Sequence, residues 1–252
     1  MVSFVVTLVV AASFAVPVLL TADTSGEQWS MSAVGWVIAA VGYLVSAYVV
    51  MFFNTGLVCA ANDHFEGGSP TLGTAMSAAG KRAGSILPWA VVSATVSFAL
   101  RAIQERLGFV GRIVIGLIGL AWALVTFLVL PIVALEGLSV GKAIKRSAEL
   151  FKHTWGENVI ANAGIGIVSL LAVLCGLPLL LLVLTGSAIL MGVGIGLFVV
   201  WVAVVSVLTS AMTVVLQTAL YRYASGLGVP EDFGQVDFAA AFTPRKGAAA
   251  AL

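Results

Sequence analysis

The hydrophobic pattern of this chain consists of long apolar runs separated by short polar connections. The longest run without a charged side chain covers the 64 residues from Asn158 to Tyr221. As one continuous helix this run would be roughly 96 Å long, at about 1.5 Å per residue. A bilayer core is only about 30 Å thick, so the run must cross a membrane more than once.

The residues on either side of this run limit the number of crossings. Lys152 precedes the run and Arg222 follows it, and basic residues are retained on the cytoplasmic side of a membrane. Both ends then lie on the same side, so the number of crossings is even. We therefore predict a two-helix hairpin with its external turn at residues 184–188 and a bend near Pro178.

Along the whole chain, the apolar runs predict six spans and an all-α fold, a polytopic transmembrane helical bundle. The predicted spans are Val2–Thr21, Val34–Ala61, Ala83–Leu100, Ile113–Leu135, Val159–Leu184 and Ala188–Tyr221. Composition agrees, because 61% of the residues are hydrophobic and 9% are charged, whereas soluble domains carry about 25% charged residues. The net charge of +1 gives no basis for a nucleic-acid partner.

Basic residues predict the orientation of the spans. Nine of the twelve lie in residues 62–82, 136–157 and 222–252. This bias places both termini in the cytoplasm and predicts a multi-pass protein of the bacterial cytoplasmic membrane. The segment 101–112 carries the other three arginines, so it is either an external loop or an amphipathic helix in the membrane interface. Those arginines are Arg101, Arg106 and Arg112.

The first predicted span could be mistaken for a signal peptide. Residues 2–21 lack the basic start and the cleavage site of such a peptide, so we expect a retained span. No basic residue precedes this span. Either the natural N-terminus lies upstream of Met1, or later loops set the orientation of the span.

Two of the predicted cytoplasmic segments resemble each other and predict short amphipathic surface helices. Ser69 and Pro70 suit the cap and first position of the first helix, and Ser139 suits the cap of the second. The similarity indicates a parallel repeat of span, surface helix and span at about 34–100 and 102–169. This repeat belongs to a transmembrane domain, residues 1–225, which a short cytoplasmic tail follows at 226–252. The aligned residues are Gly73, Ala75 and Met76 with Gly141, Ala143 and Ile144.

The basic residues of these two helices form a candidate surface for lipid headgroups or for a protein partner. The simpler interpretation is a surface connector that orients the spans, and the alternative is a gate or a docking surface. The residues of this candidate surface are Lys81, Arg82, Lys142, Lys145, Arg146 and Lys152.

Polar residues near the cytoplasmic ends of the spans form a candidate vestibule for an ion or a solute. Such groups are costly at membrane depth and are often functional, although hydrogen bonds between helices can also account for them. Glu136 is the first of them to test, because its carboxylate could pair with Arg146 or Lys142. The candidate vestibule residues are Asn54, Glu136, Asn158, Asn162 and Gln217.

Three stretches of the chain resemble an uncharacterised bacterial family of six-span membrane proteins of unknown function. They are Val133–Asn162, Phe53–Trp89 with its SPTLGTAM motif, and the tail sequence LYRYASG…VPEDF…AAF. Members usually begin with a basic cytoplasmic segment, which is missing here, and this supports a start upstream of Met1. The resemblance implies a fold but no activity.

Three functions follow from these patterns. The favoured one is a channel or transporter for an ion or small solute, in a homo-oligomer within membrane lipids. The second is a non-transporting scaffold or envelope-stress protein that binds a protein partner on the cytoplasmic face. The third, a lipid-modifying enzyme, would need His64 and His153 to meet with nearby carboxylates, and no motif supports it. We therefore expect no catalytic residues, no cofactor and no metal.

Overall fold

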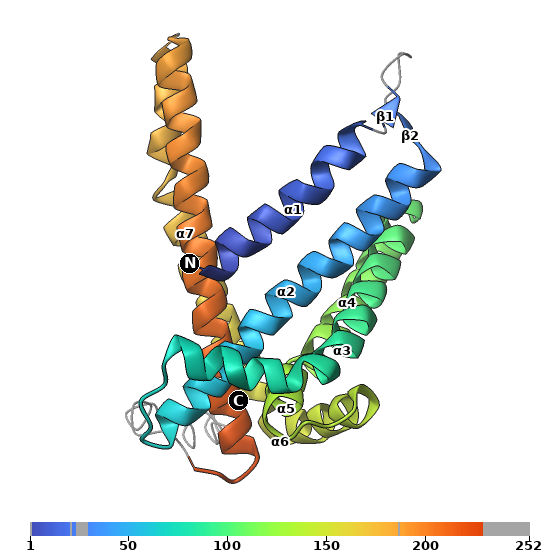
Figure 1. The fold of residues 1–252 in the computed structure, drawn as a ribbon, viewed down its shortest axis with the longest axis vertical. Helices are drawn as coiled ribbons and strands as arrows, with labels where there is room; N and C mark the ends of the chain where they lie inside the picture. Colours follow the sequence, from blue (N-terminus) through green and yellow to red (C-terminus); the bar gives the residue numbers. More distant parts are fainter. Residues whose placement is uncertain (1, 21, 24–29, 186, 229–252) are drawn as a thin grey trace, which may run out of the picture. The chain divides into compact units, whose positions relative to one another are not determined.

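The computed structural model describes residues 2–20, 22–23, 30–185 and 187–228. It does not describe the side chains of 22–23, 30–31, 152–163, 182–185 and 188, or those of some residues in the first helix. Apart from two strands of two residues each, the described elements are helices, so the predicted all-α fold is confirmed (Figure 1). The chain divides into two units, Met1–Glu149 and Leu150–Leu252, which are described separately. The elements are α1 (Val2–Leu20), β1 (Ala22–Asp23), β2 (Ser30–Met31), α2 (Ala33–Phe65), α3 (Leu72–Arg106), α4 (Phe109–Thr126), α5 (Val129–Leu135), α6 (Val140–Leu174), the 3₁₀ helix η1 (Leu177–Thr185) and α7 (Ala188–Ala224).

Five stretches of helix among the described residues are long and apolar enough to cross a membrane. This confirms the class of membrane protein. The helix α1, whose side chains are described only in part, is not among the five, so the count of six spans stays a prediction. The five are Ala33–Phe65, Leu72–Arg106, Phe109–Leu135, Gly164–Leu181 and Ile189–Ala224.

In the first unit, α1 and α2 form an antiparallel hairpin (Figure 1). The strands β1 and β2 pair between them, with Ala22 opposite Met31. The Phe14 ring of α1 rests on Gly42 of α2, where a Cβ would lie 2.6 Å from the Phe14 Cβ. The absence of a side chain at Gly42 therefore sets how closely the two helices approach.

The second helix also packs closely against α3. A Cβ on the buried Gly56 would lie 2.5 Å from the Met76 Cε and 3.3 Å from the Ala75 carbonyl oxygen. Ala75 and Ala79 are buried at this contact side of α3. Small residues again permit the close approach.

The start of α3 corrects the prediction that Ser69 caps it and Pro70 begins it. Thr71 is the N-cap, and its hydroxyl accepts a hydrogen bond from the Thr74 N–H at 3.2 Å. The Thr74 hydroxyl in turn accepts from the Thr71 N–H at 2.9 Å. This reciprocal capping box pairs two backbone donors, so the helix begins two residues later than predicted.

The two short surface helices of the sequence analysis are not separate elements. The first is the beginning of α3, and the second is the beginning of α6, because no break separates either from the helix that follows. Pro88 lies inside α3 and removes a backbone donor there. In Figure 1, α3 changes direction along its length, so one helix runs first across α2 and then alongside α4.

The segment 101–112 is not a single interfacial helix, and that alternative is wrong. Residues up to Arg106 are the last turns of α3, and α4 begins at Phe109. Gly108 has extended backbone at the N-cap of α4, which permits the reversal. The Arg112 side chain donates from Nε to the Leu107 carbonyl at 3.1 Å and so satisfies an acceptor at the turn.

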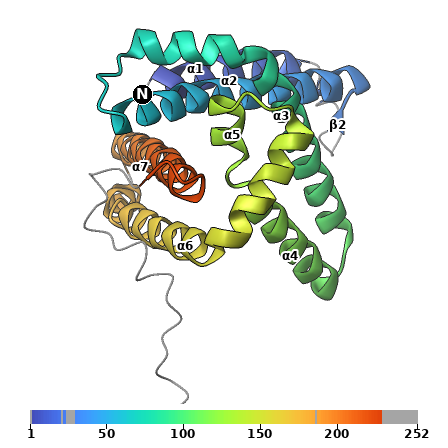
Figure 2. The same cartoon turned by 90° about the horizontal axis from the view of Figure 1, so that it is seen from below.

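The fourth predicted span consists of two helices with a break between them. α4 ends at Thr126 and α5 begins at Val129. The hydroxyl of the fully buried Ser147 accepts from the Leu128 N–H at 3.2 Å and donates to the Val125 carbonyl at 2.6 Å. Backbone groups freed at a break inside a membrane must find partners within the protein, and Ser147 of α6 supplies both. Beyond the break, α5 packs against α2 and α3 (Figure 2).

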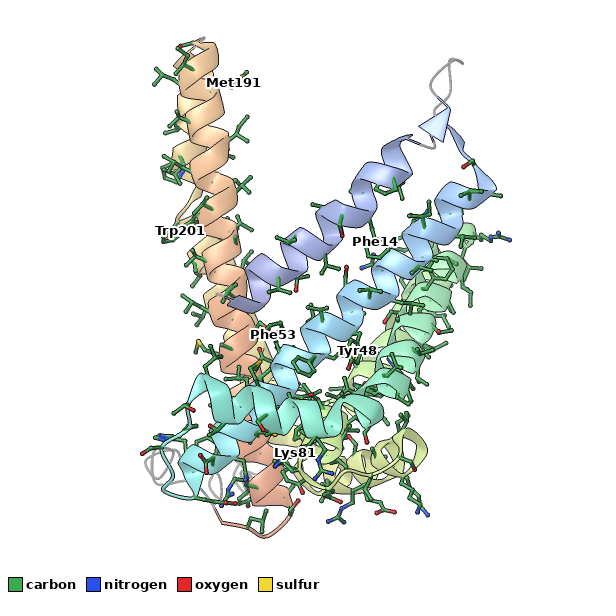
Figure 3. The ribbon with its side chains drawn as sticks, viewed as in Figure 1. Phe14, Tyr48, Phe53, Lys81, Met191 and Trp201 are labelled. Carbon is green, nitrogen blue, oxygen red and sulfur yellow. The ribbon has the colours of Figure 1, made fainter. Side chains whose placement is uncertain are left out.

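In the second unit, a similar break follows α6. The Gly176 N–H bonds to the Val173 carbonyl at 2.9 Å, and the Trp201 indole donates from Nε1 to the Ala172 carbonyl at 2.8 Å. Gly176 is buried beneath this indole ring, which a Cβ there would strike. Figure 3 labels Trp201 on α7.

The predicted position of the hairpin turn in this unit is confirmed, and its external location stays a prediction. The 3₁₀ helix η1 contains Pro178 and ends at Thr185, and α7 begins at Ala188 after the extended N-cap Ser187. The turn therefore falls within residues 184–188, and the bend occurs at Cys175–Gly176, just before Pro178. α7 ends at Ala224, and most of the predicted tail lies outside the described residues.

We predict that Ser147→Ala lowers the free energy of unfolding by about 1–3 kcal/mol, because it leaves the buried Leu128 N–H without its acceptor. Thermal unfolding in detergent measures the effect. The control is Ser77→Ala, at an exposed position in α3, which should change stability little. Equal stability of the two variants would show that the bond contributes nothing.

Candidate functional site

A cluster of polar groups from α3, α5 and α6 meets at the C-terminal end of α5 in the first unit. We call it the polar junction and define it as Arg82, Glu136, Gly137 and Arg146. Its centre is Arg82 of α3, which donates from Nε to the Ala134 carbonyl at 3.0 Å and from Nη2 to the Leu135 carbonyl at 3.1 Å. These are among the last carbonyls of α5, which have no partner within the helix.

Gly137 allows the guanidinium of Arg82 to approach. Its φ is +68°, a left-handed conformation that favours glycine, and a Cβ there would strike the Arg82 Nη1. The chain therefore turns sharply after α5 while leaving room for the arginine.

The prediction that Glu136 pairs with Arg146 or Lys142 is confirmed for Arg146. The Arg146 Nε lies 3.8 Å from the Glu136 Oε1. Glu136 is the C-cap of α5, and a carboxylate is disfavoured at a helix C-terminus by the helix dipole. The positive charges of Arg82 and Arg146 offset this repulsion.

The six bases of the candidate surface separate into two groups. Arg82 and Arg146 make contacts inside the unit. The three lysines of the first unit, Lys81, Lys142 and Lys145, are exposed. The side chain of Lys152 lies outside the described residues.

The five residues of the candidate vestibule are divided between the two units. Asn54 is half-buried in α2, and Glu136 belongs to the polar junction. Gln217 is half-buried in α7 of the second unit. The side chains of Asn158 and Asn162 lie outside the described residues. A common vestibule therefore stays a prediction.

The second unit contains a polar feature that the sequence analysis did not identify. The hydroxyls of Ser169 on α6 and Thr209 on α7 lie 2.7 Å apart and share a hydrogen bond. Thr213 and Gln217 follow Thr209 at intervals of four residues, so the three lie on one face of α7. We call Ser169, Thr209, Thr213 and Gln217 the polar stripe. Its regular spacing within an uncharged run was a signal available in the sequence.

The residues that an enzymatic function would require are described only in part. Within the described residues, no three side chains of His, Cys, Asp or Glu gather where they could hold a metal ion. At the end of α2, the Asn62 amide donates to the Glu66 carboxylate at 3.1 Å. The side chains of His153 and Glu157 lie outside the described residues, so their meeting with His64 stays untested.

Comparison with known proteins matches most of the chain to a family model. The family model described as a family of unknown function (DUF6159) matches residues 33–229. No curated protein and no solved structure matches the chain.

We predict that Gly137→Ala destabilises the protein by about 1–3 kcal/mol, because the new side chain is strained at positive φ and displaces the Arg82 guanidinium. Gly141→Ala is the matched control, since a Cβ at Gly141 meets nothing within 4 Å and alanine favours the helix there. Thermal unfolding of both variants is the measurement. A loss of stability at Gly141 as large as that at Gly137 would contradict this assignment.

A second prediction concerns the Glu136–Arg146 pair. Both side chains are partly exposed to solvent, at 27% for Glu136 and 41% for Arg146. A double-mutant cycle with Glu136→Gln and Arg146→Gln should give a coupling energy below about 1 kcal/mol, because solvent screens such pairs. The coupling should weaken further as salt is added. A coupling of several kcal/mol that is insensitive to salt would refute this view.

Proposed function

This protein belongs to DUF6159, a family of unknown function, as a helical membrane protein, and we propose that it passes an ion or small solute across its membrane. The observation that carries the proposal is the polar stripe on the facing sides of α6 and α7. We place the protein in the bacterial cytoplasmic membrane with both termini in the cytoplasm, on the distribution of its basic residues.

The polar stripe lies in the part of the chain where polar groups are most costly. It falls within the 64-residue run that has no charged side chain. Ser169 donates to the Ile165 carbonyl at 2.7 Å, and Thr213 donates to the Thr209 carbonyl at 2.8 Å. With its proton used in this way, each hydroxyl keeps oxygen lone pairs for a further partner. A row of such oxygens, ending at the Gln217 amide, suits a cation or a polar solute.

The broken helices give the proposal further support. The α4–α5 break is bridged by Ser147, and the break after α6 is bridged by Trp201. Transporters commonly build their substrate sites near discontinuous helices. Here the described residues of each unit contain such a discontinuity.

A homo-oligomer is part of the proposal. Gly192 and Gly196 of α7 are exposed, and a Cβ on either would meet nothing within 4 Å. Exposed glycines four residues apart let another helix approach closely in a membrane. A second copy of the chain could therefore pack against this part of α7.

We expect Gln217→Leu combined with Thr213→Val to lower solute flux at least about tenfold, because the variant removes polar partners along the stripe. Flux is measured in liposomes that contain the purified protein, first over a panel of monovalent cations and small polar solutes. Ser206→Ala is the matched control, because Ser206 is an exposed residue of α7 that bonds to its own helix at Val202.

Two outcomes distinguish a wrong assignment of the transport path from a wrong assignment of transport as the function. Normal flux in the double variant would show that the polar stripe is not the path, and Glu136→Gln and Asn162→Leu would then test the predicted vestibule. A lack of flux for every ion and solute in the panel would argue against transport itself.

A further inference from the structure

We propose that Lys81, Lys142 and Lys145 form a binding surface for anionic phospholipid headgroups. This inference concerns the first unit and is independent of the proposed transport. We call the three residues the lysine face.

The first step is that the arginines at this end of the unit make contacts within the protein, whereas the lysines are exposed. Both hydrogen bonds of Arg82 go to carbonyls of α5, and Arg146 is paired with Glu136. The planar, forked guanidinium suits such fixed contacts. The lysines are exposed and form no ion pair with a carboxylate among the residues that the structure describes. Their ammonium groups are therefore available to an external anion.

The second step is the position of the lysines relative to one another. Lys81 precedes Arg82, whose guanidinium reaches the end of α5, and α6 begins only a few residues farther along the chain. Lys142 and Lys145 lie in the first turns of α6, where Ser147 holds the opposite side of the helix against the α4–α5 break. The contacts of Arg82 and Ser147 thus hold both lysine-bearing segments at the same end of the unit, near the labelled Lys81 in Figure 3.

The third step concerns the acidic residues nearby. Glu136 is already paired with Arg146. Glu149 is exposed one turn after Lys145, and Asp63 and Glu66 belong to the end of α2. On the starts of α3 and α6 the bases therefore outnumber the acids, and the local charge is positive.

The fourth step identifies the kind of anion. Leu72 and Leu87, on the same helix as Lys81, are 62% and 52% exposed. α3 is long and apolar enough to cross a membrane, so a lysine near its start can extend its ammonium group to the headgroups while exposed leucines elsewhere on the helix contact acyl chains. Free phosphate would use the lysines but not the leucines. A phospholipid with a net negative headgroup uses both, and each basic residue near such a surface strengthens binding by roughly fivefold.

The test compares lipid retention by the full-length protein in detergent. Protein is equilibrated with equal amounts of phosphatidylglycerol and phosphatidylcholine, and native mass spectrometry counts the lipids that stay bound. We expect the wild-type protein to prefer phosphatidylglycerol. The variant Lys81→Gln/Lys142→Gln/Lys145→Gln should weaken this preference at least about tenfold, and added salt should weaken it in the wild type.

The matched control replaces the same three lysines by arginine, which keeps the charge and should keep the preference. Unfolding temperatures of all variants exclude a general loss of structure. Equal retention of the two lipids by the wild type would overturn the proposal. Loss of the preference on adding millimolar inorganic phosphate at constant ionic strength would assign the surface to free phosphate instead. A lysine-dependent acidic protein that co-purifies, without any lipid preference, would assign it to a protein partner.

Discussion

Inside a bilayer no water can pair with the backbone, so every N–H and C=O group at a helix break needs a partner from the protein. Side chains from several helices meet this requirement in the described part of the chain. Ser147 bridges the break between α4 and α5, Arg82 binds the carbonyls at the end of α5, and Trp201 binds the carbonyl left open near the end of α6. The helices can bend and stop where they do because these partners come from neighbouring helices.

The same requirement explains how the polar residues are used. Arg82 and Arg146 hold the end of α5 in place, so these two bases of the candidate surface have structural contacts. The exposed lysines are left for the headgroups or for another anion. In the second unit, the hydroxyls of the polar stripe bond to their own helix and to each other, so they are tolerated in an apolar run and can still accept a further bond.

Several residues of the polar junction and the polar stripe could be predicted from the sequence, but the hydrogen bonds between distant segments could not. Glu136 lies a few residues before two bases of opposite charge, so the sequence predicted a pair with Arg146 or Lys142, and the structure shows that the partner is Arg146. The bonds of Arg82 join residues more than fifty positions apart, and no spacing rule connects them. The polar stripe has a regular period, but the period does not show which face of α7 meets α6, whereas the Ser169–Thr209 and Trp201–Ala172 bonds do.

The sequence by itself determined the class of membrane protein, the approximate helices and the turn at 184–188, because hydrophobic length and the positions of charges, Gly and Pro are local properties. Only the tertiary structure decided where the helices break. The starts of α3 and α6 are continuous with long helices because nothing interrupts them, and the span at 113–135 divides because Ser147 of another helix can satisfy the opened backbone. The positions of the helix breaks depend on hydrogen-bond partners that are distant in the chain. A pattern of neighbouring residues does not identify those partners.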